Sequence, residues 1–166
     1  MGDAEHARIL AVGAYLLLTI SVVGGEMLSG RLAPPRRRRT LFGLHRMTSV
    51  AGLVAAAVHG ISQVGVASGG QAVLGIGALA SAGVTAMAWA TRRDLASRWR
   101  LIHHAAYLAF ALATIHVVAF HPPGMPLAEA AMYGSGVAAV VGLALWRAWM
   151  DQTRPKAAPR RTGPHG

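Results

Sequence analysis

Long apolar stretches, separated by short polar or basic segments, make up most of this chain of 166 residues. Five stretches reach about 20 residues, the length that an α-helix needs to cross the hydrocarbon core of a bilayer. They are rich in Gly, Ala and Ser, which let helix backbones approach closely in lipid. The pattern predicts an all-α integral membrane bundle of five transmembrane helices over residues 7–28, 40–65, 71–90, 100–120 and 126–150.

Composition favours a membrane protein over a soluble one. Hydrophobic residues make up 54% of the chain and charged residues 13%, whereas a soluble domain of this size has a larger charged surface. The net charge of +10 could suggest a nucleic acid, but the basic residues lie in short runs between apolar segments and not among aromatic residues. We therefore expect a lipid bilayer, and no nucleic acid, as partner. The absence of cysteine excludes disulfides and thiolate-bound metals.

The distribution of basic residues predicts the orientation in the membrane. Fourteen of the 16 Lys and Arg residues lie in the segments 31–39, 92–100 and 147–166. Because cytoplasmic loops carry the excess of Lys and Arg, we expect a multi-pass protein of the cell (inner or plasma) membrane with its N-terminus outside and its C-terminus in the cytoplasm. Residues 1–150 are expected to form the membrane domain, and residues 151–166, which are Pro-rich and basic, a disordered cytoplasmic tail.

Four histidines fall at matched depths in two of the predicted helices. With this topology the second and fourth helices both run outward from the cytoplasm. His45 and His59 are 14 residues apart, about 21 Å along a helix axis, and His103 and His116 are 13 residues apart, about 20 Å. The sequence therefore predicts an inner pair, His45 with His103, and an outer pair, His59 with His116.

Paired neutral imidazoles from facing helices are suited to a b-type haem. Such a haem takes two axial ligands on opposite sides of a flat ring, and coordination repays the cost of placing a polar ring in lipid. We therefore expect two haems b per chain, with the four histidines as iron ligands. Two haems, one above the other, would form an electron path across most of the bilayer.

Helical periodicity agrees with two haem ligands on one face of the second helix, but less well with two on one face of the fourth. At about 100° per residue, 14 residues fall about 40° short of four turns, so His45 and His59 share a face. Thirteen residues fall about 140° short in a straight helix. The fourth helix must therefore over-wind, bend or approach its two haems from different sides. Using His104 in place of His103 gives an error of about 120° in the other direction, so periodicity does not choose between them.

Two segments resemble the ferric reductase-like transmembrane family, which includes ferric reductases, NADPH oxidases and the haem subunit of bacterial methionine sulfoxide reductase systems. They are LHRMTSVAGLVAAAVH (44–59) and WRLIHHAAYLAFALATIH (99–116). In the second, the family's W-x3-H-x3-Y pattern with a later His corresponds to Trp99, His103, Tyr107 and His116. The resemblance covers about residues 8–150 and implies a bis-histidine, di-haem b bundle in which His103, not His104, is the ligand.

The resemblance implies transmembrane electron transfer by an oxidoreductase component. No G-x-G-x-x-G fingerprint lies between a strand and a helix, so we expect no flavin or nicotinamide domain of its own. The donor would be a quinol, a free flavin or a partner redox protein, and the sequence identifies neither catalytic residues nor the terminal acceptor. Arg46, Trp99 and Arg100 lie beside the inner pair and are candidates either for binding the haem propionates or for anchoring the inner membrane face.

Other interpretations remain open. The chain could be a cytochrome b that anchors a partner dehydrogenase or hydrogenase, or a non-redox membrane transporter or assembly protein whose histidines line a polar path. His104 is expected to be a hydrogen-bonding neighbour of the haem, and His6, His121 and His165 are expected to be solvated, with His121 a candidate for the outer haem edge. Glu26 and Glu129 are expected near helix ends, where water reaches them, with a proton-transfer role for either as the alternative.

Overall fold

The structure is a computed structural model, and it describes residues 3–29, 32–120 and 125–153. Every regular element in these ranges is helical. The α-helices are α1 (Asp3–Ser29), α2 (Arg38–Ser62), α3 (Gly69–Ala90), α4 (Trp99–His103), α5 (Ala105–Phe120) and α6 (Leu127–Thr153). Short 3-10 helices precede α2 (η1, Pro35–Arg37) and α4 (η2, Ala96–Arg98).

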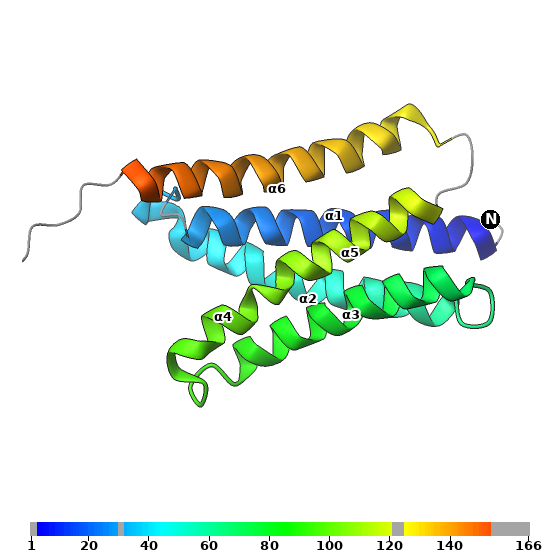
Figure 1. The fold of residues 1–166 in the computed structure, drawn as a ribbon, viewed down its shortest axis with the longest axis horizontal. Coiled ribbons are helices and arrows are strands. Elements are labelled where there is room, and N and C mark those ends of the chain that lie inside the picture. The colour runs from blue at the N-terminus through cyan, green and yellow to red at the C-terminus, as the bar shows by residue number, and fades with distance from the viewer. Residues whose placement is uncertain (1–2, 30–31, 121–124, 154–166) are drawn as a thin grey trace, which may run out of the picture.

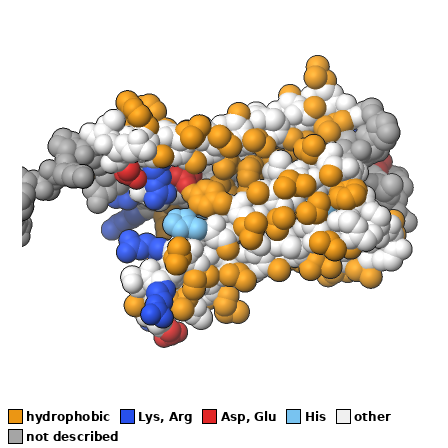
Figure 2. Space-filling view, in the orientation of Figure 1, with side chains coloured by type: hydrophobic (Ala, Val, Ile, Leu, Met, Phe, Trp, Pro, Cys, Tyr) orange, Lys and Arg blue, Asp and Glu red, His pale blue; other side chains and the backbone are white. Residues whose placement is uncertain are grey.

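Five helical stretches are long and apolar enough to cross a membrane. Four correspond to α1, α2 with η1, α3 and α6, and the fifth runs through η2, α4 and α5 over Ala96–Phe120. Large apolar side chains such as Val54, Ile76 and Leu145 point away from the bundle, and Figure 2 shows hydrophobic side chains over much of one face. Because so much exposed apolar surface suits lipid and not water, the chain is a multi-pass membrane protein, as predicted.

The observed helix ends differ from the predicted ones by a few residues. Helix α3 begins at Gly69, because the backbone N–H of Ser68 donates to Gln71 Oε1 at 2.9 Å, a contact typical of a helix start. The turn that follows α2 contains Gly65 at a φ of 85°, a backbone conformation that favours glycine. Helix α6 continues to Thr153, three residues beyond the predicted end.

The fourth predicted helix is interrupted at His104. The backbone N–H of His104 bonds to the carbonyl of Leu101 at 3.1 Å, and the N–H of Tyr107 bonds to the carbonyl of His104 at 3.0 Å. These bonds span three residues, so the chain turns by about 120° per residue here instead of about 100°. Local over-winding, one of the three solutions required by the 13-residue spacing, therefore separates His103 on α4 from His116 on α5.

The helices form two closely packed layers (Figure 1). Helix α1 packs along α2, and α3 packs along α5, while α6 covers α1. The first layer is tight, since a Cβ on Gly52 of α2 would lie 3.2 Å from Leu17 Cβ of α1. Tyr15 connects α1 to α5 and α6, with ring centroids 5.6 Å from Phe110 and 4.8 Å from Tyr133. Helices α2 and α5 run in the same direction on opposite layers (Figure 1).

Candidate functional site

A cavity of about 1970 Å³ separates the two layers. Pockets for small ligands are typically about 300–1,000 Å³, so this one has room for a large cofactor or more than one. Small side chains line much of it, and they leave space between the layers instead of bringing α2 and α5 together. These residues include Ala56 and Ala57 of α2, Gly75, Ala78 and Ala82 of α3, and Ala106, Ala109 and Ala113 of α5.

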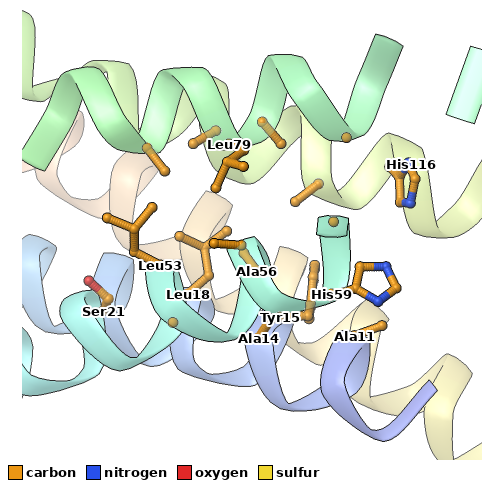
Figure 3. A pocket seen from close by; sticks show the side chains of 18 of the residues that line it. Ala11, Ala14, Tyr15, Leu18, Ser21, Leu53, Ala56, His59, Leu79 and His116 are labelled. Atoms are coloured by element: carbon orange, nitrogen blue, oxygen red, sulfur yellow. The ribbon is translucent and has the colours of Figure 1, made fainter. Parts of the chain in front are cut away.

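All four predicted histidines line this cavity, in the predicted pairs. The rings of His45 and His103 have centroids 6.2 Å apart and planes at 81°. Figure 3 shows His59 and His116 near each other on opposite sides of the pocket. Because α2 and the α4–α5 segment run in parallel, the two pairs lie at opposite ends of the same cavity.

The inner histidine of α2 is held in a defined orientation. His45 Nδ1 lies 2.8 Å from the backbone carbonyl of Ser21. Because a carbonyl only accepts hydrogen bonds, Nδ1 carries the proton and Nε2 keeps a lone pair that is available to a metal. Ser49 Oγ donates to the carbonyl of His45 at 2.6 Å, so the hydroxyl of Ser21, 2.6 Å away, donates to Ser49. Helix α1 thus positions His45 through its backbone and one side chain.

The other three histidines are less completely supported. Within the described ranges, the Nδ1 atoms of His59, His103 and His116 are buried and have no hydrogen-bond partner. The backbone carbonyls of Ala7 and Thr85 lie near His59 and His103. A small shift of the His59 or the His103 ring would give it the kind of carbonyl partner that metal-bound histidines have.

One supporting helix backs both histidines of each layer. Ala7 and Ser21 on α1 are 14 residues apart, the same spacing as His59 and His45 on the antiparallel α2. In the other layer α3 provides Thr85 beside His103, and a Cβ on Gly75 would lie 3.6 Å from His116 Cε1. The pattern of two histidines backed by one neighbouring helix therefore occurs twice, once in each layer.

The inner histidine pair fits a bis-imidazole haem site, and the outer pair offers the same two side chains across the same cavity. A metal held between two imidazole nitrogens, at about 2 Å from each, places the ring centroids about 6 Å apart, and the inner pair is 6.2 Å apart. Among the residues that the structure describes, no three His, Asp or Glu side chains converge on one point. Each pair therefore suits a metal whose other ligands come from a macrocycle, bound through the Nε2 atoms of the two imidazoles.

The remaining predicted residues are placed as follows. Arg46 lines the cavity, and the ring of Trp99 lies 5.7 Å from that of His103. Arg100 is exposed and does not line the cavity. His104 lines the cavity but is exposed, and its ring stacks on Tyr107 at 5.8 Å, so His103 and not His104 faces His45.

His6 is exposed at the other end of the cavity. His121, His165 and most of the predicted tail lie outside the described residues.

Two features of the site could not be predicted from the sequence. One is the arrangement of Ser21 and Ser49 around His45, which depends on the packing of α1 against α2. The other is Glu26, which was expected to be reached by water but is only 2% exposed, because α6 covers it and brings Arg147 to within 3.6 Å of its carboxylate. The expectation that water reaches Glu26 is therefore wrong.

Comparisons with known proteins add no assignment. No protein-family model, curated protein or solved structure matches the chain. The functional argument therefore depends on the geometry of the cavity.

Proposed function

We propose that this chain transfers electrons across the membrane through two b-type haems, as a ferric reductase-like membrane subunit. The observation that carries the proposal is the placement of two histidine pairs at opposite ends of one cavity, on two parallel helical segments of opposite layers. Four isolated histidines serving only helix packing would have no reason to pair in this way. The resemblance of the histidine helices to that family supports the same function.

In this proposal each layer of the bundle would provide one histidine ligand to each haem iron. His45 and His103 would bind the inner haem, and His59 and His116 the outer one. When bound, haem b supplies a one-electron couple between ferric and ferrous iron. The residues of the chain hold the ligands, exclude water by the apolar walls, and set the potential through burial and hydrogen bonds to the imidazoles. Arg46, which lines the cavity, and Trp99, beside His103, would contact the inner haem.

The basic end of the bundle would face the cytoplasm. The chain reverses direction so that Arg36 to Arg39, the arginines at 92–100 and Arg147 all fall at one end, where Figure 2 shows Arg side chains around a hollow. Positive charge marks the cytoplasmic side. Electrons would then enter from a quinol, a flavin or a partner protein at the inner haem and leave from the outer haem to an acceptor outside.

An optical spectrum tests the proposal. The full chain, expressed with a supply of haem precursor and purified in detergent, should give a Soret band and a b-type α-band in its dithionite-reduced minus oxidised spectrum. A monodisperse, helical preparation without a Soret band, even after haem is added, would instead favour the non-redox membrane protein.

A second function uses the same haems. The cluster of arginines at one end of the bundle is suited to an acidic partner, so we also consider a cytochrome b that anchors a dehydrogenase or hydrogenase. Co-purification of a redox enzyme that reduces the haems, and dissociates at high salt, would support this version.

A further inference from the structure

Glu26 is a carboxylate inside the bundle that the haem ligands do not use. It lies near the C-terminal end of α1, 2% exposed, and its Oε2 atom receives no hydrogen bond from any described residue. Burying a carboxylate in an apolar environment is costly unless it is paired and hydrogen-bonded. An ionisable side chain kept within a membrane span therefore points to function, with its partner as part of the site.

The partner of Glu26 is Arg147 of α6. Arg147 Nη1 lies 3.6 Å from Glu26 Oε2, while the same nitrogen donates to Ser29 Oγ at 3.0 Å. The guanidinium thus compensates the charge of the carboxylate but gives its hydrogen bond to another acceptor. Glu26 Oε2 keeps the capacity to accept a hydrogen bond from a ligand.

This carboxylate lies on the wall of the cavity at the end that holds the inner histidine pair. Glu26, Ser29 and Arg147 all line the cavity. The neighbouring Gly25 is in contact with His45, since a Cβ on Gly25 would lie 3.3 Å from His45 Cε1. The adjacent walls are apolar and include Leu18, Val22, Phe42 and Leu53. The site therefore offers one polar end, an apolar wall and a position beside the inner pair.

We propose that Glu26 and Arg147 form the polar end of a binding site for a quinol, the lipid-soluble electron donor of the inner haem. A quinol has a neutral hydroxyl that can donate to Glu26 Oε2, and an apolar body that matches the walls. A phosphorylated donor would place an anion against the carboxylate, at a large desolvation and repulsion cost. This inference rests on the proposed haem function, and it names the donor class that the function leaves open.

The oxidation step balances with two haems. A quinol loses two electrons and two protons as it becomes a quinone, and two ferric haems accept one electron each. The O–H bond of the hydroxyl next to Glu26 breaks, and an O–H bond forms on Oε2. Glu26 then passes this proton to water at the basic end, past Arg147, which is 34% exposed, while the second proton, from the hydroxyl on the far side of the quinol ring, is released directly to water.

Binding of a quinol analogue tests the site without turnover. Equilibrium dialysis of the fluorescent analogue heptyl-hydroxyquinoline N-oxide against the haem-loaded full chain should show one saturable site, competed by menadiol. Glu26→Gln keeps the size of the side chain but removes its charge, and should weaken analogue binding about tenfold. Glu129→Gln, which changes a carboxylate ion-paired with Arg8 at the opposite end, is the matched control and should bind as the wild type does. No saturable binding to the wild type, or equal binding by Glu26→Gln, would overturn the proposal.

Stopped-flow reduction provides the second test. Menadiol should reduce the haems of Glu26→Gln about 100-fold more slowly than those of the wild type, because the proton acceptor is lost. Haem content and dithionite reduction should be unchanged in this variant. If Glu26→Gln does not fold, the wild type still decides, since saturating analogue should block reduction by menadiol. Unblocked reduction would overturn the site while leaving the haem proposal intact, whereas analogue binding to a wild type that lacks haem would refute only the haem proposal.

Discussion

The two ends of the cavity hold the same pair of side chains but support them differently. At the inner end, Ser21 and Ser49 surround His45 with hydrogen bonds, and Gly25 lets α1 approach its ring. At the outer end, neither His59 nor His116 has a hydrogen bond to Nδ1 from the described residues. Each end also has an ion pair, Glu26 with Arg147 at the inner end and Glu129 with Arg8 at the outer end, but the Glu26 side chain is 2% exposed and that of Glu129 is 16% exposed.

The difference suggests that the inner site is the more preorganised of the two. A metal ligand whose second ring nitrogen is already hydrogen-bonded is fixed in tautomer and orientation, and is more basic. We therefore expect the inner haem to bind more tightly and to have the lower potential. Electrons entering at the basic end would then move toward the higher potential at the outer haem.

Removal of a ligand should have the largest effect on this comparison. His59→Ala or His116→Ala should remove the outer haem and leave the inner one. Each substitution deletes one of the two ligands of the outer haem and neither ligand of the inner haem. Haem quantification by the pyridine haemochrome method should give one haem per chain. His104→Ala is the control and should keep both haems, and two haems in both outer variants would show that the pairing is wrong.

A methyl group added beside each histidine pair should have a smaller effect on haem binding than removal of a ligand. The effect should be larger at the inner pair than at the outer pair. A Cβ on Gly25 would lie 3.3 Å from His45 Cε1, whereas a Cβ on Gly75 would lie 3.6 Å from His116 Cε1, an ordinary contact. Gly25→Ala should shift the oriented ring and weaken inner haem binding about tenfold, while Gly75→Ala leaves the outer haem unchanged. Haem transfer to apomyoglobin measures both affinities. Gly13→Ala, with open space around it, is the control on α1, and equal effects of Gly25→Ala and Gly75→Ala would contradict the difference between the ends.

A substitution that disturbs the packing of α1 against α2 should lower the stability of the whole protein, and not only haem binding at one end of the cavity. A Cβ on Gly52 would meet Leu17 Cβ at 3.2 Å and the backbone nitrogen of Leu18 at 3.4 Å, so Gly52→Ala should separate α1 from α2. The expected loss is about 1–3 kcal/mol, seen as a lower thermal unfolding midpoint in detergent. Gly60→Ala, on the same helix with nothing within 4 Å, should not lower the midpoint. A normal midpoint for Gly52→Ala would show that this layer is not tightly packed.

The smallest expected effect concerns the serine hydroxyls. Ser49→Ala removes the bonds to the His45 carbonyl and to Ser21, which loosens the imidazole and makes it less basic. The midpoint potential of the inner haem should rise by about 30 mV. Ser62→Ala is the matched change at the outer end, because Ser62 Oγ also donates to a ligand carbonyl, that of His59 at 2.7 Å, but has no hydrogen bond to another helix among the described residues. Potentiometric titration should show no comparable shift there, and equal shifts would remove the distinction.

Much of the architecture could be predicted from the sequence because lipid imposes simple rules. Span length, apolar composition and the runs of arginine predict five helices, and the 14- and 13-residue spacings predict which histidines share a depth. Periodicity could not decide how His103 and His116 reach the same cavity, because the local over-winding at His104 supplies part of the missing rotation and has no signature in the spacing of the histidines. Recognition of the Ser68 and Gln71 pair would have corrected the start of α3.

The contacts that surround the site residues could not be predicted. The orientation of His45 depends on a backbone carbonyl of α1, and the burial of Glu26 depends on α6, whose Arg147 is 121 residues further along the chain. Neither contact has a local sequence signature. The small residues were expected to bring helices together, and several instead line the space between the layers, a choice that only the tertiary arrangement reveals.

The number of haems per chain tests the central claim most directly. The wild-type protein, purified with haem in excess and freed of unbound haem, should contain two haems b per chain, measured by pyridine haemochrome against protein mass from amino-acid analysis. A folded, helical and monodisperse preparation with no haem would contradict the account, and a maximum of one haem would contradict the paired arrangement of the four histidines.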